Sequence, residues 1–175
     1  MKIQLSQKDI ADIQHIRDKI ENNSSQLDSI VDEIVHPYSK DLDKYVDFIR
    51  SCLADGTEKA SDVELEDWCL NLSTLIYFAG CMCERLGIRE DISKAVYKEI
   101  YHTARASQDK GTVADKDSLA ELASQEEQLV NVCYSRAYKI MKAKIDNAQE
   151  LMSSCKKALS RRMQEMELTR LGGNQ

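Results

Sequence analysis

Residues 129–166 read LVNVCYSRAYKIMKAKIDNAQELMSSCKKALSRRMQEM and decide the fold of the chain. Small and apolar side chains recur there at steps of mostly three and four residues, which is the spacing of one face of an α-helix. The pattern begins near Ala114, and no glycine or proline interrupts it before Gly172. We therefore predict either one helix of about 80–85 Å or two helices separated by a break near Glu126-Glu127.

A helix of that length cannot bury its apolar face inside a compact domain of 175 residues, whose radius of gyration would be about 16 Å. It must pack against other long helices, either of the same chain or of neighbouring copies. The single proline and six glycines are also typical of a helical rather than a β-rich chain. We expect an all-α, elongated helical bundle that is oligomeric.

The N-terminal segment carries a heptad repeat. Its core positions are occupied by Ile13, Ile16, Ile20, Asn23, Leu27, Ile30 and Ile34. This stripe predicts a helix that packs along another helix. The single polar member, Asn23, either fixes the register of that contact or lies in solvent where the helix frays. We expect His36-Pro37 to end the helix, because the residue before a proline is disfavoured in the α conformation.

Shorter helices are predicted between these two patterns. They cover about 39–54, 61–86 and 90–106. Ser61 and Glu64 have the spacing of a capping box at a helix start. Gly56 and Gly87 read as helix ends. The chain would then consist of an N-terminal coiled-coil helix, residues 1–36, and a helical domain, residues 38–175.

The charge of the chain is unevenly distributed. The total is −6, but residues 1–67 carry −8, residues 68–132 carry −3 and residues 133–175 carry +5. Such asymmetry indicates a localised anion-binding surface, head-to-tail self-association, or a basic helix that is merely solvated. The sequence alone leaves these three readings open.

The cysteines and the N-terminus indicate the compartment. No signal peptide is recognisable, so the six cysteines are expected to be reduced and mostly buried. Cys81 and Cys83 should point to nearly opposite sides of a helix. The longest uncharged run, Trp68 to Cys83, is too short and polar for a membrane span. We expect a cytoplasmic protein (in the host cell if it is viral) with no membrane partner.

Catalytic motifs are scarce. The sequence contains no glycine-rich phosphate loop, no nucleophile elbow and no zinc-ligand spacing. Glu64 and Asp67 share a helical face, as in the Mg²⁺-binding acidic pairs of all-α hydrolases, but no second pair of matching spacing follows. A capping box explains Glu64 better. We predict no enzyme, no metal site and no cofactor.

Cationic residues gather on two of the predicted helices. Lys94, Lys98 and Arg105 alternate with Tyr97 and Tyr101 on the first. On the last helix they are Lys139, Lys142, Lys156, Lys157, Arg161 and Arg162. Lysine and arginine neutralise phosphates, and tyrosine rings stack on unpaired bases. Together with Tyr101, these cations are the predicted contacts to single-stranded DNA; the alternative is that they only keep helix faces solvated.

Residues 65–170 resemble the UvsY-type recombination mediators of T-even-like tailed phages. The segment SKAVYKEIY at 93–101 is similar to the basic, aromatic-rich helix of that family, although Ile100 stands where a further basic residue is expected. Residues 119–166 resemble its C-terminal helix. The resemblance implies a ring-like homo-oligomer that binds single-stranded DNA, displaces the single-strand-binding protein and loads a RecA-like recombinase, without a cofactor.

The apolar patterns also predict the contacts between copies. These residues are Ile13, Ile20, Asn23, Leu27, Ile145, Met152, Leu159 and Met163. They would serve equally well in a structural or adaptor coiled-coil protein, such as a virion or scaffold component. Such a protein would pair its acidic half with the basic half of a neighbour and would not bind nucleic acid.

Overall fold

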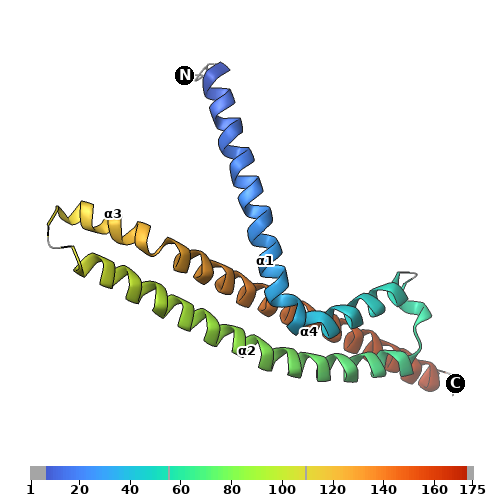
Figure 1. The fold of residues 1–175 in the computed structure, drawn as a ribbon. Coiled ribbons are helices and arrows are strands. Elements are labelled where there is room, and N and C mark those ends of the chain that lie inside the picture. Colours follow the sequence, from blue (N-terminus) through green and yellow to red (C-terminus); the bar gives the residue numbers. More distant parts are fainter. Residues whose placement is uncertain (1–6, 55, 109, 173–175) are drawn as a thin grey trace.

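The computed structural model describes residues 7–54, 56–108 and 110–172, with side chains from Gln14 onward except Thr57. These ranges contain helices and no β-strand (Figure 1), which confirms the predicted all-α fold. The long helices are α1 (Gln7–Leu53), α2 (Asp62–Ala106) and α4 (Gln125–Gly172). The short ones are α3 (Val113–Ala123) and the 3-10 turn η1 (Thr57–Lys59).

Helices α2 and α4 run antiparallel along their lengths and form a hairpin that α3 closes (Figure 1). Near the closed end, the Ser93 hydroxyl donates to Asn131 Oδ1 over 3.2 Å. At the open end, the Arg162 guanidinium donates to Asp62 Oδ1 over 2.8 Å. These two contacts fix the register of the hairpin at both of its ends.

Helix α2 begins as predicted and ends later than predicted. Ser61 caps it, since the Glu64 amide donates to Ser61 Oγ over 3.2 Å and the Ser61 amide donates to Glu64 Oε2 over 2.7 Å. The predicted end at Gly87 is wrong, and the predicted helices 61–86 and 90–106 are one helix. Leu86 and Ser93 are both buried, so packing holds both sides of the glycine. That packing outweighs the cost of about 1 kcal/mol for a glycine inside a helix.

Helix α1 passes through Pro37, so the predicted end at His36-Pro37 is wrong as well. The predicted helix 39–54 is the second half of α1. Val35 and Ser39, on either side of the proline, are both buried, and this packing offsets the hydrogen bond that proline cannot make. The two halves of α1 point in different directions (blue and cyan in Figure 1), which a proline inside a helix explains. The division into domains 1–36 and 38–175 stays a prediction.

The C-terminal apolar pattern forms two helices, which agrees with the second of the two predicted alternatives. Helix α3 ends at Ala123 and α4 starts at Gln125, one residue before the predicted site. Ser124 between them is buried, and its hydroxyl donates to the Ala120 carbonyl over 2.8 Å. Thr112 caps α3 in a second capping box with Asp115.

The middle of the apolar face of α4 is covered within the chain, while Leu129 and Met163 nearer its two ends are exposed. Ala137, Met141, Ala148 and Cys155 are buried in a core that includes residues of α1 and α2. A long helix therefore finds long partners in its own chain, and its burial requires no second copy. Oligomerisation stays a prediction.

The N-terminal half of α1 projects from this bundle (Figure 1). We call residues 14–34 the arm. Ile16, Ile20 and Ile30 on it are 57%, 61% and 46% exposed, while Leu27 and Ile34 pack partly against the core. The heptad stripe is therefore covered at the base of the arm and open along the rest of it.

The cysteines are free thiols. Cys81 is exposed and Cys83 is buried, as their spacing predicts. Within the described ranges, no helix has the length and apolar character that crossing a bilayer would need.

Candidate nucleic-acid interface

Lys94 and Lys98 are an accessible part of the predicted site. They lie one helical turn apart on α2, and both are exposed. Neither forms an ion pair or a hydrogen bond with a described residue. Tyr97 lies between them and is half-buried, and its ring centroid is 6.3 Å from that of Tyr101. Two unpaired ammonium groups and an aromatic pair therefore occur together on this part of α2.

Tyr101 and Arg105 are held by a residue that the sequence did not point to. Asp117 of α3 receives a hydrogen bond from the Tyr101 hydroxyl over 3.3 Å and an ion pair from Arg105 Nε over 2.6 Å. Loss of solvent raises the pKa of Tyr101, and the neighbouring Asp117 carboxylate raises it further. These two side chains therefore stabilise the corner between α2 and α3 and are less available to a ligand than the two lysines.

Lys142 and Lys156 lie close to α2, although they belong to α4. Burial raises the pKa of the Cys83 thiol, and the positive charge of Lys142 acts in the opposite direction. Burial likewise raises the pKa of Cys69, against the opposing effect of Lys156. Both lysines are exposed and have no ion pair in the described chain. They therefore border the seam where α2 meets α4.

The same seam passes Gly87 and Tyr138. A Cβ placed on Gly87 would lie 3.3 Å from Tyr138 Cε2. Lys94 and Lys98 follow Gly87 by seven and eleven residues, and these spacings keep them on nearly the same face of α2. By the same reasoning, Lys142 lies one turn after Tyr138 on its face of α4. We call Lys94, Lys98, Lys142 and Lys156 the seam lysines.

Helix α1 contacts other faces of the hairpin. Lys144 Nζ lies 2.7 Å from Asp43 Oδ1 of α1. Arg89 of α2 lies over the Tyr38 ring of α1, 5.8 Å from its centroid. The seam lysines share neither of these faces, so α1 does not cover them.

The remaining predicted cations have mixed surroundings. Lys139 and Lys157 are exposed on α4, eighteen residues apart on one face, with Glu150 between them on that face. Arg161 Nε forms an exposed ion pair with Glu165 Oε1 over 2.8 Å. Lys139 lies three residues before Lys142, as a neighbour on the surface of α4, whereas Glu150 and Glu165 interrupt the rest of this basic run.

Arg162 binds within the chain. Its NH1 atom donates to the Ala60 carbonyl over 2.7 Å as well as to Asp62. It therefore joins the end of α4 to the start of α2. This contact gives the residue a structural role that its place in a basic run did not indicate.

The predicted contacts between copies fall into two groups. Ile145, Met152 and Leu159 pack into the core of the single chain. Their assignment to an interface between copies stays a prediction. Another copy is no longer needed to bury them, because the chain itself covers them. Ile20, Asn23 and Met163 are exposed, and Leu27 is half-buried. The side chain of Ile13 lies outside the described residues.

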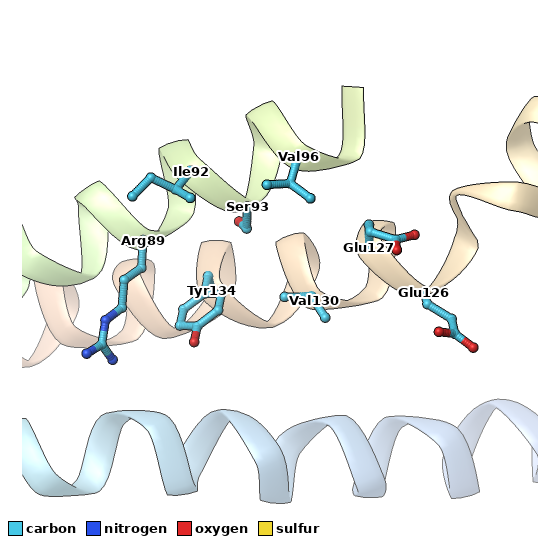
Figure 2. Close-up of a pocket in the computed structure, with 8 residues that line it drawn as sticks. All are labelled: Arg89, Ile92, Ser93, Val96, Glu126, Glu127, Val130 and Tyr134. Carbon is cyan, nitrogen blue, oxygen red and sulfur yellow. The ribbon is translucent and has the colours of Figure 1, made fainter. Parts of the chain in front are cut away.

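An open pocket of about 410 Å³ lies between α2 and α4 (Figure 2). Its walls include Ile92 and Val96 of α2 and Val130 and Tyr134 of α4. Glu127 Oε2 is buried at this site without a hydrogen-bond partner in the described chain. In the described ranges, no group of His, Cys, Asp and Glu side chains could hold a metal ion. Arg89, Glu126 and Glu127 also line the pocket, so its wall combines apolar side chains with charged ones.

Sequence reasoning missed the exposed outer face of α2. Val63, Leu70, Tyr77, Ile88 and Ile92 are each between 58% and 69% exposed. The seven-residue spacing of the first three was visible in the sequence, but the richer pattern of the buried face obscured it.

The α2–α4 seam thus carries four exposed lysines, and exposed apolar side chains lie on α1 and on the outer face of α2. Comparison with protein-family models, curated proteins and solved structures finds no match to this chain.

Proposed function

We propose that this chain, as an oligomer, binds single-stranded DNA, displaces the single-strand-binding protein and helps to load a RecA-like recombinase. The observation that carries the proposal is the exposure of Lys94 and Lys98, without ion pairs, beside Tyr97. The resemblance of residues 93–101 to the mediator family supports it. The proposed function needs neither catalysis nor a cofactor.

Lysines of this kind bind phosphates without reading sequence, because each contact releases counterions from the nucleic acid. The seam lysines extend the positive charge along α2 and α4, although the acids Glu66, Glu84 and Asp146 act on the same two seam cysteines, Cys69 and Cys83. A single copy would bind weakly, with four cations. Association of several copies would multiply the affinity, since the second contact of a tethered strand is intramolecular.

Binding can be tested by fluorescence anisotropy with a labelled oligothymidylate at several salt concentrations. We expect the double variant Lys94→Ala, Lys98→Ala to bind roughly tenfold or more weakly at low salt, with a salt slope smaller by about 2. The matched control is Lys40→Ala, Lys44→Ala, which removes two exposed lysines one turn apart on α1. Absence of binding by the wild-type oligomer, or equal losses in both double variants, would contradict the proposal.

Recombinase loading needs its own assay. On single-stranded DNA that the single-strand-binding protein covers, a RecA-like recombinase hydrolyses ATP only after that protein has been displaced. We expect the chain to shorten the lag of that ATPase on covered DNA, and the Lys94, Lys98 variant to leave the lag unchanged. DNA binding without any effect on the lag would restrict the function to DNA binding.

A structural or adaptor role is the second candidate. It is favoured by the exposed outer face of α2 (Val63, Leu70, Tyr77, Ile88 and Ile92), which is larger than isolated surface residues would explain. Assembly that high salt weakens, with no affinity for DNA at any salt concentration, would favour this role over the first.

A further inference from the structure

The heptad stripe of the arm continues into a groove. Leu27, Ile30 and Ile34 of the arm line one wall of an open groove of about 680 Å³, and Leu129 and Val130 of α4 line the other. Beyond the groove, Ile16 and Ile20 extend the same stripe into solvent, more than half exposed. A second helix lying along the arm would cover the exposed isoleucines and reach this groove.

The charges of the arm select the direction of that helix. The base of the arm, residues 21–34, carries Glu21, Asp28, Asp32 and Glu33 and no cation. The part nearer the N-terminus, residues 14–20, carries Arg17 and Lys19 against Asp18. Two arms side by side in parallel would bring their acidic bases together. Two antiparallel arms would place each acidic base beside the cations of the other.

We propose that the arms of two copies pair as an antiparallel coiled coil. In the register that matches the stripe, Ile20 lies opposite Ile30 of the second copy and Ile16 lies opposite Ile34. Lys19 and Glu33 of the second copy then flank the apolar contact at positions that face each other in antiparallel pairs. The arrangement has a two-fold axis, so every contact occurs twice and the association closes without further copies.

A parallel pair fits the same arm less well. In-register parallel arms would place the two bundles at the same end and would set Asp28, Asp32 and Glu33 beside the same residues of the second copy. An antiparallel pair places the two bundles at opposite ends of the paired arms. The proposed arm pairing identifies the contact that would join copies in the oligomer of the proposed function. It does not depend on DNA binding.

Disulfide cross-linking distinguishes the two directions. The experiment uses the full chain with the exposed Cys81 replaced by serine. We expect the variant with both Ile20→Cys and Ile30→Cys to form a covalent dimer under mild oxidation, and either single variant to remain unlinked. Efficient linking of the single variants would show parallel arms. Linking in none of the three would show that the arms do not pair, and either result would overturn the proposal.

Light scattering measures the number of 19.9 kDa chains in the particle. We expect an even number of copies in the wild type and half that number for Ile20→Asp. The matched control is Asn22→Asp, an exposed position outside the stripe, which should keep the wild-type number. Because Ile20 is 61% exposed, its replacement leaves the core intact, and circular dichroism checks this. An odd number, or no change in Ile20→Asp, would overturn the proposal.

Charge reversal tests the register. We expect Lys19→Glu and Glu33→Lys each to weaken association at least tenfold at low salt, and the double variant to recover most of it. Failure of the double variant to recover would exclude this register. Even-numbered particles that do not bind oligothymidylate would overturn only the proposed function. Monomers that still bind it would overturn only the arm pairing.

Discussion

The ring of Tyr138 on α4 lies directly over the backbone of Gly87 on α2, where a Cβ would come within 3.3 Å of Cε2. A side chain at position 87 would therefore require the Tyr138 ring to move by a few tenths of an ångström. Both residues lie on the seam that the exposed lysines border. The seam therefore depends on the absence of a side chain at position 87.

Gly80 and Gly87 form a matched pair for testing this contact. Both are inside α2, but no atom lies within 4 Å of a Cβ placed on Gly80. We expect Gly80→Ala to stabilise the protein by up to about 1 kcal/mol, since alanine favours a helix over glycine. Gly87→Ala should gain clearly less or destabilise, because Tyr138 must move. Urea denaturation measures both, and equal gains would mean that Tyr138 does not restrict position 87.

The ion pair between Lys144 and Asp43 should anchor the second half of α1. Asp43 also accepts a hydrogen bond from the Ser39 hydroxyl over 2.6 Å, and about a third of each charged side chain is exposed. We expect Lys144→Ala to destabilise the chain by about 1 kcal/mol, at the upper end for partly exposed pairs. A double-mutant cycle with Asp43→Ala isolates the pair. Additive losses would show that the two side chains are not coupled.

Replacing Arg162 and Lys157 in turn compares a cation that bridges two helices with one that lies in solvent. Arg162 bridges Ala60 and Asp62, whereas Lys157 is exposed and has no described partner. We expect Arg162→Ala to cost about 1–3 kcal/mol of folding free energy, the range for hydrogen bonds to charged groups. Lys157→Ala should change it by less than about 0.5 kcal/mol. Similar effects of the two changes on the urea midpoint would argue against the bridge.

The two capping boxes make the helix starts sensitive to acid. Hydrogen bonds from Ser61 hold the pKa of Glu64 below its ordinary value, and those from Thr112 do the same for Asp115. A lowered pKa means that the folded chain favours the ionised carboxylate. The stabilisation is therefore complete above the ordinary carboxyl pKa and is lost as the pH falls through the lowered one.

We expect the melting temperature of Ser61→Ala to fall less steeply with acid than that of the wild type in this range. At pH 7 the variant should be less stable by about 1 kcal/mol, the usual loss for an N-cap serine. Ser73→Ala, an exposed serine inside α2, is the control. Because the variant keeps the Ser61 amide that also donates to Glu64, parallel pH curves would show that the Ser61 hydroxyl does not contribute to the lowered pKa of Glu64.

Asp117 should restrain DNA binding if the proposed function is right. Its carboxylate accepts a hydrogen bond from Tyr101 and pairs with Arg105, and it adds a negative charge on the side of α2 that carries Lys98. We expect Asp117→Ala to bind oligothymidylate several-fold more tightly at low salt, because a cation is released and an anion is removed. Asp47→Ala, an exposed acid on α1, makes the same change in net charge far from the seam. An equal gain in both variants would mean that only net charge matters.

Local signals in the sequence were sufficient for the helical content and for the Ser61 cap, and they left the break beside Glu126 as one of two alternatives. They misled at Pro37 and Gly87, because each local rule for ending a helix was outweighed by burial on both sides of the residue. They also could not assign Arg105 or Arg162 to partners, since the partners, Asp117 and Asp62, come close only when the hairpin forms. A run of cations on a helix does not reveal which members are neutralised by another helix.

The hairpin joins residues of steadily increasing separation along the chain. Ser93 and Asn131 are 38 positions apart, Cys69 and Met152 are 83 apart, and Asp62 and Arg162 are 100 apart. The entropy lost on closing a loop grows with its length, so contacts next to α3 are the least expensive to form. We expect folding to zip from the α3 turn towards Arg162, which makes the far end of the hairpin the last part to close and the first to fray.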